Sequence, residues 1–306
     1  MTTRPFPIAG LSRYVYGTTR LGDTDLPRES RHQIARRAID AGCWFHTSRQ
    51  YGEALEVLGE VFGEDRGKVP PLFAKIGHES LDELRDSIRD NLNPLGLETL
   101  EVGQLCLSGP YAQDLARGGR LFDDLQVLKE EGLVKHFVLE VFPWTSEAPY
   151  EGLKNGHGEG LIDAFIFYLN PLQRFADNRL WDLIRERNAP VIAMRTIGGA
   201  PVHTLRDVPG AAWVPYLQER AVEVAPIFER SGIEDWTEFC VRFAFSFPQV
   251  QATVGSTSRG ENLDAFLRAS SGVAVEPLPG DIVEELQALQ YRWSDETDVK
   301  AEPWTM

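Results

Sequence analysis

The chain has 306 residues, 42% of them hydrophobic, and its 46 acidic residues against 31 basic ones give a formal charge of −15. This acidic balance excludes a role in binding nucleic acid or anionic lipid. No apolar run approaches the roughly 18 residues of a membrane-spanning helix, and no apolar leader follows the first methionine, so we expect a cytoplasmic protein without membrane contact.

The three cysteines, Cys43, Cys106 and Cys240, are an odd number and lie far apart in apolar surroundings. This pattern favours reduced thiols over a disulfide framework or a zinc site. The histidines also lack metal-ligand spacing, so we expect no metal.

Short apolar runs bounded by turn residues predict eight β-strands, at residues 13–18, 44–48, 72–77, 101–107, 134–142, 164–169, 191–197 and 250–256. Between them, leucine, isoleucine and aromatic residues recur at spacings of three and four. This periodicity predicts helices at 30–42, 54–63, 80–92, 121–132, 178–188 and 262–269, with Gly42 as a C-cap.

Alternating strands and helices over this length favour a closed (β/α)8 TIM barrel, in a single domain spanning residues 1–306. An open doubly wound sheet would carry G-x-G-x-x-G after an early strand, and the chain has no such sequence. Because a barrel works at the C-terminal ends of its strands, residues there are the candidates for function. The segment 198–217, rich in glycine and proline, predicts a long loop that shapes a substrate pocket.

A tyrosine and a lysine lie near the ends of two successive predicted strands. Tyr51 belongs to C-W-F-H-T-S-R-Q-Y-G at 43–52, and Lys75 interrupts the apolar run L-F-A-K-I-G. A tyrosine hydroxyl titrates near pH ~10, and a neighbouring cation lowers its pKa. We therefore predict that Lys75 activates Tyr51 as a proton donor. The alternative is that Tyr51 only flanks a helix and Lys75 only ends a strand in solvent.

Motifs over nearly the whole chain resemble those of the aldo-keto reductases, barrel enzymes that reduce carbonyl groups with NADPH. In order they are G-T-T-R-L-G at 17–22, A-R-R-A-I-D-A-G-C-W-F-H-T-S-R-Q-Y-G at 35–52, F-A-K-I-G at 73–77, L-K-E-E-G-L-V-K-H-F-V at 128–138, I-A-M-R-T-I-G-G-A at 192–200 and V-G-S-T-S-R-G-E-N-L at 254–263. The resemblance implies NADP(H) as cofactor, and it assigns Gly17 and Thr18 of the opening turn to cofactor binding.

Members of that family use a tetrad of Asp, Tyr, Lys and His, in which the tyrosine protonates the carbonyl oxygen as hydride arrives. Tyr51 and Lys75 match their places, but His46 stands in the aspartate place and Cys106 in the histidine place. His46 cannot supply the negative charge that would hold Lys75 protonated, although it can act as a general acid or base. It could also be a core histidine, and we interpret Cys106 as an apolar filler rather than a nucleophile.

The resemblance also implies a nicotinamide pocket, in which a Ser-Asn pair and a Gln hold the carboxamide and a ring stacks on the nicotinamide. The matching positions are Glu140, Val141, Ile166 and Met194. Valine and isoleucine offer no polar group in this pocket. Glu140 either pairs with Lys75 or Arg195, which restores a charge partner, or performs acid–base chemistry. We assign Arg195, beside Met194, to the cofactor; it could instead bind an acidic substrate group or neutralise Glu140.

The segment at 254–263 combines hydroxyls, backbone N–H groups and an arginine at the start of a predicted helix, which suits phosphate binding. It resembles the family's site for the 2′-phosphate of NADP. The residues assigned are Gly255, Ser256, Thr257, Ser258, Arg259 and Asn262. Arg259 favours NADP(H) over NAD(H).

We therefore predict an NADP(H)-dependent oxidoreductase that acts on a small carbonyl or alcohol substrate through a divergent active site of His46, Tyr51, Lys75, Cys106 and Glu140. One alternative is a redox-neutral lyase, dehydratase or isomerase in which Tyr51, Lys75, His46 and Glu140 transfer protons. A second is a non-catalytic binding protein, because barrels carry unrelated functions.

Overall fold

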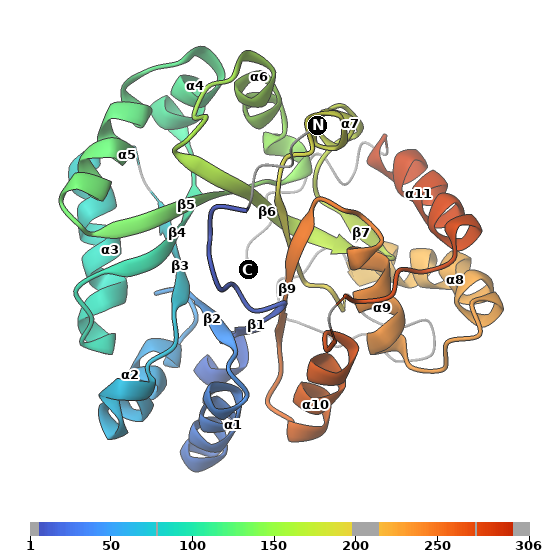
Figure 1. The fold of residues 1–306 in the computed structure, drawn as a ribbon, viewed down its shortest axis with the longest axis horizontal. Coiled ribbons are helices and arrows are strands. Elements are labelled where there is room, and N and C mark those ends of the chain that lie inside the picture. Colours follow the sequence, from blue (N-terminus) through green and yellow to red (C-terminus); the bar gives the residue numbers. More distant parts are fainter. Residues whose placement is uncertain (1–5, 78, 198–213, 273, 296–306) are drawn as a thin grey trace.

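Eight parallel strands close into a barrel that is surrounded by helices (Figure 1). The computed structural model describes residues 6–77, 79–197, 214–272 and 274–295. In these ranges the barrel strands are β1 (Tyr14–Gly17), β2 (Trp44–Thr47), β3 (Leu72–Gly77), β4 (Leu100–Cys106), β5 (Val134–Glu140), β6 (Ile162–Asn170), β8 (Val191–Met194) and β9 (Val250–Ser256). Each pairs in parallel with its neighbours in the order β5-β4-β3-β2-β1-β9-β8-β6, and the pairing of β5 with β6 closes the ring. A short strand, β7 (Gln173–Arg174), folds back antiparallel on β6.

Helices connect the strands around the outside of the barrel (Figure 1). The α-helices are α1 (Arg28–Asp40), α2 (Ala54–Glu64), α3 (Leu81–Leu95), α4 (Gly109–Arg117), α5 (Arg120–Glu130), α6 (Glu147–Asn155), α7 (Asn178–Arg187), α8 (Val214–Arg230), α9 (Trp236–Phe245), α10 (Gly260–Ala269) and α11 (Gly280–Ser294). The 3₁₀ turns in the described part of the chain are η1 (Thr19–Gly22), η2 (Arg66–Lys68) and η3 (Pro143–Thr145). None of the helices within the described ranges is both long and apolar enough to cross a membrane.

The predicted barrel and all eight predicted strands are confirmed, with end points that differ by a few residues. Gly42 takes a left-handed conformation with φ of 73° one residue after the C-cap of α1, which fits its predicted role at the helix end. The predicted helices missed α4, α6, α8, α9 and α11. The loop predicted at 198–217 is wrong at its end, because α8 begins at Val214; residues 198–213 lie outside the described residues.

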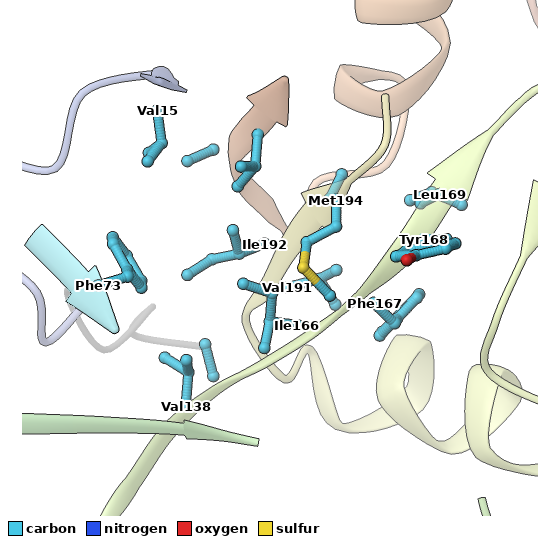
Figure 2. Close-up of a cluster of buried hydrophobic side chains, with 14 of the residues drawn as sticks. Val15, Phe73, Val138, Ile166, Phe167, Tyr168, Leu169, Val191, Ile192 and Met194 are labelled. Atoms are coloured by element: carbon cyan, nitrogen blue, oxygen red, sulfur yellow. The ribbon is translucent and has the colours of Figure 1, made fainter. Parts of the chain in front are cut away.

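Branched and aromatic side chains from opposite strands fill the barrel interior. Figure 2 shows Val15, Phe73, Val138, Ile166 and Ile192, from five different strands, pointing toward one another. All five are fully buried. Burying a side chain of this size contributes roughly 1.5–3 kcal/mol of stability. This apolar layer therefore stabilises the barrel directly below the C-terminal ends of its strands.

Candidate active site

Polar side chains lie just above this apolar layer, at the C-terminal ends of the strands. Because successive side chains of a strand point to opposite faces, a residue two positions further along points the same way. Lys75 is two residues beyond Phe73, and Glu140 is two residues beyond Val138. The sequence therefore places an ammonium group and a carboxylate inside the barrel at its working end.

Lys75 and Glu140 form a buried ion pair. The Lys75 Nζ donates to Glu140 Oε1 at 2.9 Å, and the two side chains are only 6% and 2% exposed. The Cys106 Sγ donates to the second carboxylate oxygen, Oε2, at 2.7 Å. Burial is the largest single influence on Lys75 and lowers its pKa, but Glu140, with smaller contributions from Tyr51, Cys106 and Tyr168, raises this pKa above its usual value. Lys75 is therefore an ammonium at neutral pH.

Tyr51 is held at the edge of this pair by the turn that follows β2. Tyr51 is 7% exposed, and the centroid of its ring lies 6.1 Å from that of His46. Burial raises the pKa of Tyr51, the Lys75 charge lowers it, and Glu140 raises it again, with a net increase. The expected influence of Lys75 is present, but desolvation is larger. Tyr51 thus keeps its proton at neutral pH and is suited to donate it.

His46 faces the barrel interior and binds Gln104, a residue that the sequence interpretation did not select. Its Nε2 lies 2.6 Å from Gln104 Oε1, while Gln104 Nε2 donates to Met194 Sδ at 3.9 Å. Because an amide oxygen can only accept, His46 donates from Nε2. Burial, followed by the Lys75 charge, lowers the pKa of His46 to about 4. His46 is therefore neutral and supplies no charge to the site.

Apart from Glu140, the positions of the expected nicotinamide pocket are apolar and enclosed. Val141 and Ile166 are fully buried, and Met194 is 4% exposed. Arg195 follows β8 with a left-handed φ of 45°, and its guanidinium lies 4.9 Å from the centroid of the Tyr168 ring. Of the two expected partners of Glu140, Lys75 is the one that the structure places in an ion pair with it.

The expected adenine-side turn runs from the end of β9 into α10. Ser256 and Arg259 are exposed, and Thr257 Oγ1 accepts from the backbone N–H of Arg259 at 3.1 Å. Arg259 is the N-cap of α10 but makes no side-chain cap bond. A helix start without a side-chain cap, flanked by an exposed arginine, suits a phosphate group. Ser258 is half-buried and Asn262 exposed on the same turn.

The opening turn is packed between β9 and the Tyr51 turn. A Cβ on Gly17 would lie 3.3 Å from the backbone of Gly255, so glycine permits this close approach. Thr18 is fully buried, and its hydroxyl donates to that of Thr47 at 2.9 Å. Gly22 is tighter still, because a Cβ there would come within 1.7 Å of the Tyr51 carbonyl oxygen. The opening turn thus fixes the backbone of the candidate proton donor.

The structure brings His46, Tyr51, Lys75, Cys106 and Glu140 into one group at the strand ends, in which all but the half-buried Cys106 are buried. Gln104 was missed, although one signal was present. It is a polar residue two positions before Cys106 in an apolar run, and therefore shares its face of the strand. Within the described ranges, no cluster of His, Cys, Asp or Glu side chains could hold a metal ion.

Comparisons with known proteins agree with this architecture. The model of the Aldo/keto reductase family matches residues 13–289. The holo form of aldo-keto reductase AKR11C1 from Bacillus halodurans is 18% identical with a TM-score of 0.69, and the alignment covers 92% of each chain. A putative aldo-keto reductase from Pseudomonas aeruginosa is also 18% identical, with a TM-score of 0.60 over 88% of this chain and 96% of that one. No curated protein matches the chain significantly. Because the family model covers most of its length, the chain belongs to the aldo/keto reductase family.

Proposed function

We propose that the protein is an NADP(H)-dependent oxidoreductase that interconverts a small carbonyl compound and its alcohol, with Tyr51 as the proton donor. The buried Lys75–Glu140 ion pair beside Tyr51 is the observation that carries this proposal. Such a pair is costly to desolvate unless it is well bonded, and here it lies where a barrel enzyme performs its chemistry. Perturbed ionisable groups at such a place favour a catalytic role.

The proposed roles follow from the charges. The Tyr51 hydroxyl donates its proton to the carbonyl oxygen as negative charge develops there, and the Lys75 ammonium stabilises the phenolate that remains. Glu140 keeps Lys75 protonated despite its burial. In the reverse direction the same phenolate takes the proton of an alcohol. NADPH, when bound, supplies the hydride for reduction.

The residues of the protein fit the adenine end of this cofactor better than its nicotinamide end. The uncapped start of α10, with Arg259 and the hydroxyls of Ser256 and Ser258, fits a phosphate group such as the 2′-phosphate of NADP. The polar clamp for the carboxamide has no equivalent at Val141 and Ile166. We therefore propose that affinity comes mainly from the adenine end, with Gly17, Thr18, Gly255, Thr257 and Asn262 forming the rest of that side and Met194 and Arg195 lying on the nicotinamide side.

The apolar character of Val141 and Ile166 favours a second candidate function. In it the protein catalyses a redox-neutral reaction next to a carbonyl group, and Tyr51 and Lys75 move protons without a hydride donor. The same pair of residues serves both reactions, because each needs a proton placed on or removed from an oxygen.

Titration with NADPH separates the two functions. The purified protein is titrated while its tryptophan fluorescence is followed, and the complex is then mixed with a series of aldehydes. We expect saturable binding and oxidation of the bound NADPH. Absence of binding at high micromolar NADPH would refute the reductase proposal, and binding without oxidation by any aldehyde would favour the redox-neutral reaction.

A further inference from the structure

We propose that a cavity outside the barrel interior binds a phosphate ion, with the guanidinium groups of Arg174 and Arg220 as donors and the side-chain carbonyl of Gln290 as acceptor. All three residues line this cavity, together with Phe175 and Trp293. It lies between β7, α8 and α11, which are neighbours on one side of the barrel (Figure 1). The inference is independent of the proposed function, because none of the three residues belongs to the candidate active site or to the adenine-side turn.

Arg174 is a buried cation with one unused donor. It is 6% exposed, its Nε donates to the Ala176 carbonyl oxygen at 3.1 Å, and its Nη2 donates to the Asn178 side chain. Both of these acceptors are neutral. In the described part of the chain, the third nitrogen, Nη1, is buried and has no hydrogen-bond partner. Because a buried N–H group without an acceptor costs free energy, an oxygen atom placed beside Nη1 would stabilise the protein.

The charge of Arg174 persists at neutral pH. Burial lowers its pKa to about 10, which still leaves the guanidinium protonated at pH 7. Its guanidinium carbon lies 4.7 Å from the centroid of the Tyr291 ring, and stacking of this kind holds the plane of the group. An occupant with negative charge would therefore meet a cation that is already oriented.

Arg220 brings a second guanidinium group to the same cavity. It is 5% exposed, its Nη1 donates to the Leu172 carbonyl oxygen at 3.0 Å, and its guanidinium carbon lies 4.5 Å from the centroid of the Trp293 ring. Two guanidinium groups that line one cavity favour an anion over a neutral ligand. Their planar arrays of N–H donors match the oxygens of phosphate and carboxylate groups.

Gln290 on α11 determines which anion fits. It is 2% exposed, and its Nε2 donates to the Asn170 carbonyl oxygen at 2.8 Å. Its Oε1 is buried and has no partner among the described residues. Because an amide oxygen only accepts, the occupant has to supply a donor as well as charged oxygens. Hydrogen phosphate supplies both at pH 7, whereas sulfate and carboxylates have no O–H group at this pH.

The size of the cavity limits its occupant to one small group. The space open to the centre of a water-sized sphere is about 10 Å³, which suits one water molecule or one small ion rather than a nucleotide. A water molecule would satisfy Arg174 Nη1 and Gln290 Oε1 but would bring no negative charge to the two arginines. Phosphate satisfies both atoms and supplies the charge.

Isothermal titration calorimetry with phosphate and with sulfate at pH 7 tests this inference, with sodium chloride added to keep the ionic strength constant. We expect the wild-type protein to bind one phosphate ion with a Kd of about 1 mM or below. Sulfate should bind at least about tenfold more weakly, because it leaves Gln290 Oε1 without a donor. This comparison needs no variant.

Four variants assign the binding to the cavity. R174Q removes one cation and should weaken phosphate binding at least about tenfold. Q290L removes the acceptor and should make the affinities for phosphate and sulfate nearly equal. R179M is the matched control, because Arg179 is an exposed arginine of α7 that pairs with Glu147, and it should bind phosphate as the wild-type protein does. R259M, which changes the adenine-side turn, should also keep this affinity.

The outcomes separate the cavity from other phosphate sites. No saturable binding to the wild-type protein at up to about 10 mM phosphate would overturn the proposal and leave water as the occupant. An affinity unchanged in R174Q, or lost in R259M, would also overturn it. Equal affinities of the wild-type protein for phosphate and sulfate would overturn the role of Gln290. Circular dichroism checks that R174Q folds, and if it does not, the wild-type comparison and Q290L decide the inference.

Discussion

Most residues of the candidate site were predictable from the sequence, but the contacts between them were not. Tyr51 and Lys75 stand out because each interrupts or follows an apolar strand. The partner of Glu140 depends on how far each strand is shifted against the next, and a sequence does not state this register. Gln104 was missed for the same reason, because its partner His46 is 58 positions away in the chain.

The buried His46 gives a pH dependence with a defined sign. Its pKa falls from 6.5 to about 4 on folding, so between these pH values the unfolded chain binds a proton that the folded protein does not. The free energy of unfolding therefore decreases as pH falls through this window, and this contribution is fully present only above pH 6.5. The loss is on the order of 3 kcal/mol by pH 4.

Urea denaturation of the wild-type protein and of H46Q from pH 7 to pH 4 measures this contribution. Glutamine keeps an amide donor near Gln104 but does not titrate. We expect the free energy of unfolding of H46Q to fall less steeply with acid than that of the wild-type protein. Equal slopes for the two proteins would show that folding does not lower the pKa of His46.

At the level of elements, strands were easier to predict than helices. The strands are short apolar runs buried on both sides, a pattern that parallel sheets produce. α9 was missed because W-T-E-F-C-V-R-F-A-F is apolar around most of its circumference, as expected of a helix packed against both β6 and β9. The helices α4, α8 and α11 begin beside proline or glycine. These residues suggested turns, although proline is also favoured at a helix start, and the helices were therefore missed.

The contact between the opening turn and the Tyr51 turn predicts a strong effect of a small change. In G22A the new methyl group overlaps the Tyr51 carbonyl oxygen, so the backbone of one turn has to move. We expect a loss of at least about tenfold in kcat/KM, because a displacement of about 1 Å is costly for a catalytic group. Gly63 in α2 is the matched control, since no atom lies within 4 Å of a Cβ there.

Steady-state kinetics and urea midpoints of G22A and G63A test this expectation. G63A should keep its activity and gain stability, since alanine favours helix over glycine by up to about 1 kcal/mol. A G22A protein with wild-type kcat/KM would mean that the opening turn does not hold Tyr51 in place.

On the scale of the whole molecule, alternating elements were enough to predict the closed barrel, and the family match agrees with it. The single domain over residues 1–306 stays a prediction. The overall charge of −15 opposes an anionic cofactor at long range, so binding depends on local groups such as the start of α10.

Thermal unfolding with added cofactor tests this local contribution. A ligand at a hundred times its Kd stabilises the folded protein by about 2.7 kcal/mol. We expect NADPH to raise the Tm of the wild-type protein more than NADH does, and R259M to abolish this difference. R268M, at the exposed far end of α10, should preserve it. An unchanged preference for NADPH over NADH in R259M would show that Arg259 does not bind the phosphate.

The most direct test of the central claim is the rate of hydride transfer in Y51F. The enzyme is first saturated with NADPH and then mixed with an aldehyde that the wild-type protein reduces, and the loss of NADPH absorbance is followed in a single turnover. We expect Y51F to bind NADPH as the wild-type protein does and to transfer hydride at least about a hundredfold more slowly, because the proton donor is gone. A wild-type rate in Y51F would contradict the assignment of Tyr51 as the proton donor.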